Sequence, residues 1–380
     1  MTDLDQKPRL RFKGFTEAWE QRELGQTVQI TMGTSPEGST YSDVPSDHIL
    51  IQGNADLVDG WVVPRVWTTQ VTKKADVGDL IMSVRAPAGA MGKTAYNAVI
   101  GRGVAAIKGN EFIYQILIKM DANGYWKKLS AGSTFESLNS EAIKKAEIKV
   151  PNTREQEQIG NLLFNVDSLI TLHQRKYEKL KSMKTALLEK MFPAGNDTSP
   201  KIRFKGFTEA WEQRKVKEIA ERYDNLRIPV AASQRERGSI PYYGANGIQD
   251  YVNGFTHNGE FVLVAEDGAN DLKNYPVQYV NGKIWVNNHA HVLQSNKNNN
   301  TMFLKYLIGS TDIESLLVGG GRAKLNAEVL MSIDLTLPNK VEQKQIAIFF
   351  DRLDSLITLH QRKCEKLKNL KKSLLERMFI

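Results

Sequence analysis

Two segments of the chain carry apolar residues at alternating steps of three and four. The first, residues 155–192, contains no proline and a single glycine, and a closely similar segment lies 187 residues further on. This spacing over four heptads is typical of helices that pack in a coiled coil. We therefore predict two long helices, whose expected contact positions are Leu163, Val166, Ile170, Tyr177, Leu180, Leu187, Phe350, Leu353, Ile357, Cys364, Leu367 and Leu374.

These segments belong to a larger internal repeat. The letters RFKGFTEAWEQR occupy residues 11–22 and again 203–214, and DSLITLHQRK occupies 167–176 and again 354–363. The stretches between them share little. Uniform divergence after a duplication would not leave intact blocks beside dissimilar ones. We call the repeated segments the frame and the dissimilar stretches the inserts, and infer that the two evolve under different constraints.

Each insert has the pattern of a mixed α/β domain. GDLIMSVRAPAG and GRGVAAIKGN in the first, and GEFVLVAEDGAN and GKIWVNNHAHVLQSN in the second, are typical of strands between turns. We expect an α+β protein in which two mixed α/β domains are separated by an antiparallel coiled coil, with approximate internal two-fold symmetry. The expected boundaries are 1–153 for the first domain, 154–192 for the first helix, 193–201 for a linker, 202–340 for the second domain and 341–380 for the second helix.

The two helices most simply pack against each other. An antiparallel arrangement would relate the halves by a two-fold axis and place the inserts at opposite ends of the pair. If the helices align end to end, Tyr177 lies near Cys364. His173 and His360 fall on the same stripe, and we interpret them as buried polar residues that fix the register.

Composition limits the possible classes of protein. The 380 residues include one cysteine and carry a formal net charge of +8. A single cysteine excludes an internal disulfide framework and a metal site built from several cysteines. No apolar run is long enough to span a bilayer and the N-terminus does not resemble a signal peptide, so we expect a cytoplasmic protein with no membrane partner. The basic balance favours a polyanionic partner.

Motifs for catalysis are weak. PAGAMGKT, ending at Thr94, has Pro87 where a phosphate-binding loop needs glycine. His289 and His291 lie two apart in one predicted strand and could begin a metal site, but no third ligand has suitable spacing, and we favour a structural role. We find no glycine-rich cofactor loop and no nucleophile elbow. The balance of these motifs favours a binding protein, and we expect no catalytic residue, metal or cofactor on this chain.

Basic and amide side chains near predicted strand ends and loops are the candidate DNA contacts. Arginine and lysine bind phosphates, and arginine and asparagine also bind base edges. The loop GGGRAK in the second insert could bring backbone amides and two cations to a phosphate, although its counterpart GSTFES has no cation. The candidates are Arg65, Arg85, Lys93, Arg102, Lys127, Lys128, Arg235, Arg237, Lys273, Asn287, Asn288, Arg322 and Lys324.

The whole chain resembles the specificity subunit of type I restriction-modification systems. The similarity lies in the two FTEAWEQR blocks, the helices that contain DSLITLHQRK, and the segments SVRAPAG and GKIWVNNHAHVL. The resemblance implies two target-recognition domains that bind a bipartite site in double-stranded DNA, with an unread spacer set by the helix pair. It also implies two methyltransferase subunits that modify adenine N6, and restriction subunits that translocate DNA. S-adenosylmethionine, ATP and Mg are then expected on those partners.

Two other interpretations stay open from sequence. One is a coiled-coil adaptor whose inserts bind proteins, and it differs from a DNA-binding protein in needing no steep salt dependence of duplex binding. The other is a self-sufficient methyltransferase, which would bind S-adenosylmethionine as the isolated chain.

Overall fold

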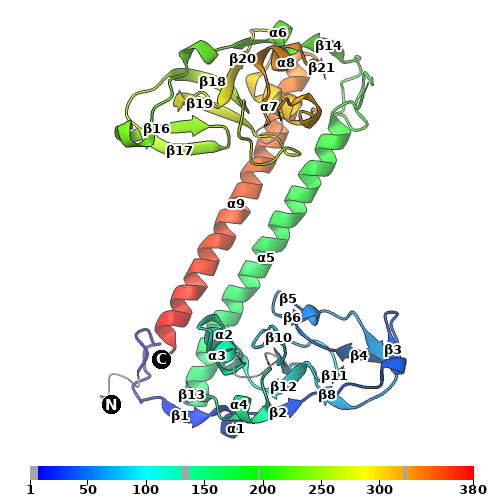
Figure 1. Ribbon diagram of the computed structural model, residues 1–380, viewed down its shortest axis with the longest axis vertical. Coiled ribbons are helices and arrows are strands. Elements are labelled where there is room, and N and C mark those ends of the chain that lie inside the picture. The colour runs from blue at the N-terminus through cyan, green and yellow to red at the C-terminus, as the bar shows by residue number, and fades with distance from the viewer. Residues whose placement is uncertain (1–6, 131–136, 196, 320–322) are drawn as a thin grey trace. The chain divides into compact units, whose positions relative to one another are not determined.

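The computed structural model describes residues 7–130, 137–195, 197–319 and 323–380 (Figure 1). The chain divides into two compact units: unit 1 is Met1–Arg175 with Gln361–Ile380, and unit 2 is Lys176–His360. Both boundaries fall inside long helices, α5 (Thr153–Met191) and α9 (Lys340–Met378). The predicted α+β class, with two sheet-containing domains and two long helices, is confirmed.

The long helices begin at the same local sequence. In each copy an asparagine follows a proline and caps the helix: Asn152 Oδ1 accepts a hydrogen bond from the Glu155 amide at 3.0 Å, and Asn339 Oδ1 from the Glu342 amide at 3.1 Å. Each helix has 39 residues, or about 58 Å at 1.5 Å per residue. Over the described residues, no helix has the combined length and apolarity required to cross a membrane.

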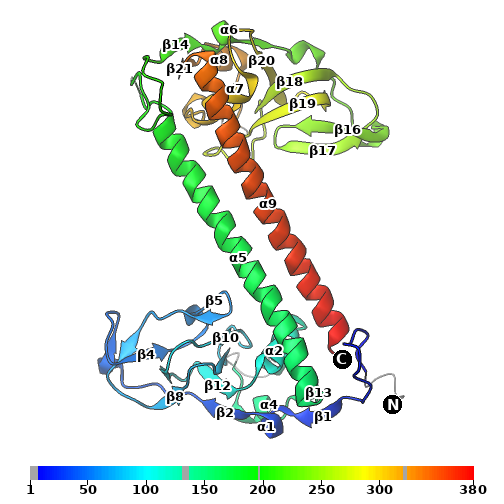
Figure 2. The same cartoon turned by 180° about the vertical axis from the view of Figure 1, so that it is seen from behind.

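Unit 1 contains two larger sheets and a two-stranded one. The larger sheets have the strand orders β2-β12-β9-β10-β6-β5 and β3-β7-β4-β11-β8. Helices α1 and α4 lie side by side next to the small sheet of β1 and β13 (Figure 2). The elements are β1 (Glu20–Glu23), α1 (Leu24–Thr27), β2 (Gln29–Met32), β3 (Tyr41–Ser42), β4 (His48–Ile51), β5 (Leu57–Val58), β6 (Trp61–Val62), β7 (Trp67–Thr68), β8 (Lys73–Ala75), β9 (Leu80–Ser83), β10 (Met91–Lys93), β11 (Ala98–Ile100), β12 (Val104–Lys108), α2 (Glu111–Ala122), α3 (Tyr125–Ser130), α4 (Ser140–Lys144) and β13 (Glu147–Val150).

Unit 2 contains one larger sheet with the order β15-β20-β18-β19-β16-β17 and a two-stranded sheet of β14 and β21. Helix α7 packs against β18, β19 and β20 (Figure 1). The elements are β14 (Glu212–Lys215), α6 (Val216–Ile219), β15 (Ala220–Arg222), β16 (Arg237–Gly244), β17 (Gly247–Val252), β18 (His257–Ala265), β19 (Val277–Val286), β20 (Ala290–Ser295), α7 (Thr301–Gly309), α8 (Ala327–Ser332) and β21 (Asp334–Leu337).

The frame forms the same buried ion pair in both units. Glu155 and Glu342 are completely buried, and each accepts two hydrogen bonds from an arginine of the repeated RFKGF block. The distances are 2.6 and 2.7 Å from Arg11 and 2.7 Å twice from Arg203. A buried carboxylate needs such a bidentate partner to offset its desolvation. This pairing gives a physical reason for the verbatim repeat.

Within each unit the segments of α5 and α9 run antiparallel. In unit 1, Asp167 forms an ion pair with Lys371 at 2.7 Å, and seven residues later Gln174 Oε1 accepts a hydrogen bond from Cys364 Sγ at 3.2 Å. From the first contact to the second, the residue number rises by seven in α5 and falls by seven in α9, as expected for antiparallel helices. The hydrogen-bonding partner of Cys364 is thus Gln174 and not Tyr177, which corrects the register expected from end-to-end alignment.

In unit 2 the equivalent ion pair joins Lys184 to Asp354 at 2.6 Å. Lys184 and Lys371 lie seven residues after Tyr177 and Cys364 and so continue the same stripe, and each lysine pairs with an aspartate on the other helix. Among the predicted contact positions, five are buried: Leu163, Val166, Phe350, Leu353 and Cys364. The others are half-buried: Ile170, Tyr177, Leu180, Leu187, Ile357, Leu367 and Leu374.

Candidate nucleic-acid interface

Two connections of equal length occupy corresponding places in the two units. Residues 101–103 join β11 to β12 in unit 1, and residues 287–289 join β19 to β20 in unit 2. The first residue of each connection donates its backbone amide to a neighbouring strand, to the Ile51 carbonyl at 2.8 Å in unit 1 and to the Tyr243 carbonyl at 3.0 Å in unit 2. Both connections therefore start from the same backbone pairing.

The two connections also end in the same way. The carbonyl of the third residue accepts a hydrogen bond from the Val84 amide in unit 1 and from the Glu266 amide in unit 2, both at 2.9 Å. The carbonyls of Val84 and Glu266 in turn accept from the amides of Leu138 and Leu325, both at 2.8 Å. The backbone thus matches residue for residue, and Arg102 corresponds to Asn288.

Each unit also has an equivalent isolated β-bridge. Arg85 pairs with Ser137 in unit 1, and Asp267 pairs with Lys324 in unit 2. We define the unit 1 edge as Arg85, residues 101–103 and Ser137, and the unit 2 edge as Asp267, residues 287–289 and Lys324.

The unit 1 edge is cationic and open. Arg85 and Arg102 are exposed, and neither side chain has a hydrogen bond or ion pair within the described part of the chain. The backbone amide of Arg102 is held by Ser35 Oγ at 3.2 Å. At Gly103 a Cβ atom would lie 2.0 Å from the Gln52 carbonyl oxygen, so only glycine fits there. The connection is therefore rigid while its arginine is free to bind.

The unit 2 edge has different chemistry at the same positions. Asn288 is exposed, and its side chain has no partner among the residues described. His289 Nδ1 lies 2.5 Å from Asp267 Oδ1, and Lys324 Nζ lies 2.9 Å from Glu266 Oε1. The His289 ring and the Lys324 ammonium already have acidic partners, so the amide of Asn288 is the open group of this edge.

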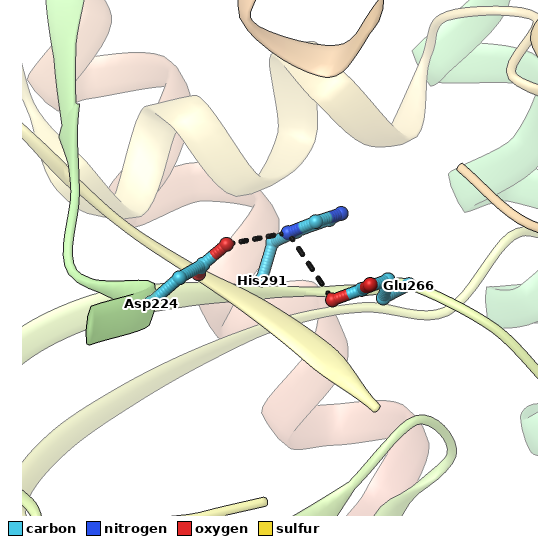
Figure 3. A group of neighbouring side chains, drawn as sticks. All are labelled: Asp224, Glu266 and His291. Carbon is cyan, nitrogen blue, oxygen red and sulfur yellow. Dashed lines mark hydrogen bonds and ion pairs between the residues drawn. The ribbon is translucent and has the colours of Figure 1, made fainter. Parts of the chain in front are cut away.

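Behind the unit 2 edge, His291 lies between two carboxylates (Figure 3). Its Nδ1 is 2.7 Å from Asp224 and 3.7 Å from Glu266, and its Nε2 is 2.9 Å from the Leu325 carbonyl oxygen. The ring therefore links the Asp224 carboxylate to the backbone of Leu325. Because Leu325 follows Lys324, this cluster fastens the edge to the sheet.

Both carboxylates of the cluster are ionised more readily than usual. Burial opposes ionisation of Asp224, but His291, the Val292 amide and Arg227 together bring the pKa of Asp224 below its ordinary value. Burial likewise opposes ionisation of Glu266, and its hydrogen bonds from Arg227 and Lys324 lower its pKa overall.

This cluster also answers the question of a metal site. Asp224, Glu266 and His291 offer ligand atoms within 4.8 Å of one another, the only such trio in the described ranges. Arg227 lies 2.7 Å from Glu266 and 3.5 Å from Asp224, so fixed cations already neutralise the carboxylates. His289 has a separate partner in Asp267. We therefore interpret the trio as structural. The two histidines that sequence placed on one strand have different surroundings, because His289 precedes β20 and only His291 lies in it.

The other candidate cations of unit 1 differ in availability. Lys93 Nζ is 2.8 Å from Glu111 and lies over the rings of Trp61, Tyr114 and Phe164 at 5.0, 4.6 and 4.9 Å. Its side chain is only 11% exposed.

Arg65 is half-exposed, with its guanidinium 3.4 Å from Asp56. Lys127 and Lys128 are exposed on α3. Lys127 and Lys128 are therefore available to bind a polyanion, Arg65 is partly available, and Lys93 is not available.

The other candidates of unit 2 show the same division. Arg235 lies over the Tyr242 ring at 4.1 Å and approaches Asp250 at 3.4 Å, so it packs within the domain. Arg237 and Lys273 are exposed. Asn287 is buried, and its Oδ1 accepts the His289 amide at 2.8 Å, which shapes the connection. Arg322 lies outside the described residues.

Sequence reasoning missed residues that only the fold brings to the edges. Gln249, on β17, accepts a long hydrogen bond of 3.4 Å from Asn287 and helps to line a pocket of about 300 Å³ beside Asn288 and His289. Ser35 reaches the unit 1 edge from a distant part of the chain. No periodicity marks either residue, because each is placed by pairing between remote strands.

The family model described as Type I restriction modification DNA specificity domain matches residues 16–182 and again 208–369. A Haemophilus influenzae protein named as a type I restriction enzyme specificity subunit is 43% identical over 145 residues, which cover 38% of each chain. One from Methanocaldococcus jannaschii is 29% identical over 182 residues, covering 45% of this chain and 42% of that protein. The chain thus spans less than half the length of these two relatives.

Among solved structures, the S subunit of a type I restriction-modification system from M. genitalium matches with a TM-score of 0.75. The match covers 98% of this chain and 99% of that one at 14% identity, and so it concerns the fold.

Proposed function

Since the chain belongs to the type I restriction-modification DNA specificity family, we propose that it selects the DNA target of a type I restriction-modification complex. Unit 1 recognises one short half-site and unit 2 another, with a spacer of fixed length between them that neither contacts. The chain then directs adenine-N6 methylation or restriction by its partner subunits, which act on DNA in the cytoplasm.

The observation that carries this proposal is the contrast between frame and edges. The buried arginine–glutamate pair and the backbone pattern at the two edges are repeated, whereas the side chains at the edges differ in charge and hydrogen-bonding type. A protein that recognises two unlike half-sites requires this combination. Free arginine and asparagine side chains are suited to base edges, and the exposed lysines to phosphates.

The helix pair supports a fixed spacer. Two helices held by ion pairs at Asp167 and Asp354 resist sliding, because a shift of either helix would separate half-buried charged partners. We propose that helix length sets the spacer.

The same helices support a protein partner present in two copies. Leu169 and Leu172 are 45% and 44% exposed, and their repeats Leu356 and Leu359 are exposed to the same extents. Exposed apolar groups that recur in this way suit two identical binding surfaces. We assign them to two methyltransferase subunits, which hold S-adenosylmethionine, with restriction subunits that use ATP and Mg joining the assembly. This chain supplies recognition and no catalytic step.

The decisive experiment is methylome sequencing of cells that express the chain with its methyltransferase partners. We expect one bipartite adenine-methylated motif. In a second strain, seven residues are inserted in both helices, between residues 175 and 176 and between 360 and 361. The spacer should lengthen by about three base pairs, from ~1.5 Å per residue and ~3.4 Å per base pair. An unchanged spacer refutes the helix pair as the determinant.

Binding of the purified chain to duplex DNA separates this function from that of an adaptor. We expect affinity to fall steeply with salt, as counterion release requires. The adaptor would be favoured by duplex binding that does not depend on salt, or by the absence of duplex binding even when the methyltransferase subunits are present.

A further inference from the structure

We infer that Arg102 and Asn288 occupy one position of the repeated fold and each determine a base in the half-site of its own unit, a guanine for Arg102 and an adenine for Asn288. This inference rests on the proposed function and names the residues that give it specificity.

The first step is positional. The connections 101–103 and 287–289 have the same length and form the same backbone hydrogen bonds before and after the middle residue. The Cα atoms of Arg102 and Asn288 therefore hold the same place relative to the strands of their own units. Both side chains are exposed, so each can reach a ligand without rearrangement of the sheet.

The second step is chemical. Arginine offers two parallel N–H donors that match O6 and N7 of guanine in the major groove, whereas asparagine offers one donor and one acceptor that match N7 and N6 of adenine. Neither side chain has a partner in the portion that the structure describes, so no internal bond must break before a base is bound. An adenine edge uses both the donor and the acceptor of the Asn288 amide, whereas a phosphate can use only the donor, which favours a base over the backbone at Asn288.

The third step is the state of the neighbouring groups. The connections are fixed from behind, by Ser35 at the Arg102 amide and by the buried Asn287 beside Asn288. In unit 2 the nearby cation Lys324 is paired with Glu266. A rigid backbone with a free side chain at the middle position can discriminate between bases, because the loop cannot move to accommodate a wrong base.

The test exchanges the two residues. Arg102→Asn, Asn288→Arg and the double variant are expressed as full chains with the methyltransferase subunits, and each complex selects from a random duplex library. Lys13→Asn and Asn298→Arg, both exposed and away from the edges, repeat the charge changes as controls.

We expect Arg102→Asn to lower the preference for guanine at one position of one half-site by about 5- to 150-fold, which is the about 1–3 kcal/mol that a bidentate contact contributes. Asn288→Arg should lose a similar preference for adenine in the other half-site only. The controls should leave both half-sites unchanged.

If the wild-type complex selects a bipartite motif but neither exchange alters it, this inference is wrong while the proposed function stands. A uniform loss of affinity, with the motif intact, assigns the residues to phosphates and also overturns it. If the wild-type complex selects no motif at all, the proposed function itself fails.

Discussion

Units 1 and 2 agree in the repeated frame and differ at the two edges. Arg11 with Glu155, and Arg203 with Glu342, form the same bidentate pair, and both glutamates are fully buried. At the edges, by contrast, exposed arginines in unit 1 correspond to an amide and internally paired charges in unit 2. Buried charge tolerates few substitutes, so the frame repeats; an exposed side chain on a fixed backbone can change with the ligand.

The two units also differ in how the domains are fastened to the helices. In unit 1, Asp167 accepts a hydrogen bond from Gln115 on α2 at 2.8 Å. In unit 2, the equivalent Asp354 accepts from Lys305 at 2.7 Å and Tyr306 at 2.9 Å on α7. The two equivalent aspartates therefore differ in their domain partner, which is the neutral Gln115 for Asp167 and the cation Lys305 for Asp354.

The largest expected effect comes from the shared arginine–glutamate pair. Arg11→Ala should lower the free energy of unfolding of unit 1 by about 3–5 kcal/mol, because it leaves a buried carboxylate unpaired. Arg203→Ala should do the same to unit 2. Hydrogen exchange with mass spectrometry in denaturant can assign each loss to its unit.

The exposed pairs of the same repeat provide the control. Arg22→Ala and Arg214→Ala break ion pairs with Glu20 and Glu212 at the surface and should cost less than about 1 kcal/mol. A marked inequality between Arg11→Ala and Arg203→Ala would show that the two frames are not energetically equivalent.

A smaller and unequal effect is expected at the helix contacts. Asp354→Asn should destabilise unit 2 by about 2 kcal/mol and Asp167→Asn should destabilise unit 1 by about 1 kcal/mol, because the first leaves two lysines without their carboxylate and the second leaves one. Chemical denaturation followed by hydrogen exchange measures both. Glu157→Gln, an exposed change on α5, should be neutral. Equal losses at Asp354 and Asp167 would contradict the role of the extra cation.

Acid should reveal the same asymmetry. In unit 2, burial opposes ionisation of Asp354, but Lys305 and Lys184 bring its pKa below the ordinary value, as His291 does for Asp224. A carboxyl group whose pKa is lowered by folding stabilises the folded state at any pH above its pKa in the unfolded state, which is about 3.9 for aspartate. This stabilisation is lost as the pH falls through the pKa of the folded state. Unit 2 should therefore weaken below about pH 4.

The carboxyl groups of unit 1 with shifted pKa values, Asp76 and Asp121, are less buried than Asp354 and Asp224. The hydrogen bond from Lys108 lowers the pKa of the exposed Asp76. Burial raises the pKa of Asp121, so protonation of Asp121 by acid removes an unfavourable buried charge. Exchange measured between pH 7 and pH 3, corrected for intrinsic rates, should show unit 2 opening first. Asp224→Asn should reduce this difference, and earlier opening of unit 1 would contradict it.

The frame could be predicted from sequence because its information is local and repeated. Helix periodicity, the Pro-Asn start of each helix and the stripe gave two long helices, but the register needed the positions of Lys371 and Lys184, whose aspartate partners lie on the other helix. Alternation could not distinguish a continuous strand from two strands joined by a short connection, so the sequence predicts His289 and His291 in one strand although only His291 lies in β20.

The candidate DNA contacts were harder, because charge alone does not report pairing. Arg102 and Lys93 look alike in sequence, as cations near glycine and strand ends. The fold brings Ser35 to the backbone of Arg102 and leaves its side chain free, whereas it brings Glu111 and three aromatic rings to Lys93. These partners are remote in sequence, and only strand pairing and helix packing place them.

The smallest expected effect follows from this contrast. Lys93→Met keeps an unbranched apolar side chain among Trp61, Tyr114 and Phe164, and Glu111 keeps its hydrogen bond from Gln115 at 2.8 Å. We expect a loss of no more than about 1 kcal/mol in the stability of unit 1, since the Glu111 side chain is 19% exposed to water and keeps the hydrogen bond from Gln115, and no change in the salt dependence of duplex binding. Lys127→Met, at an exposed cation of the same unit, provides the comparison for DNA affinity. A lower salt slope for Lys93→Met would mean that Lys93 leaves its aromatic surroundings to bind phosphate.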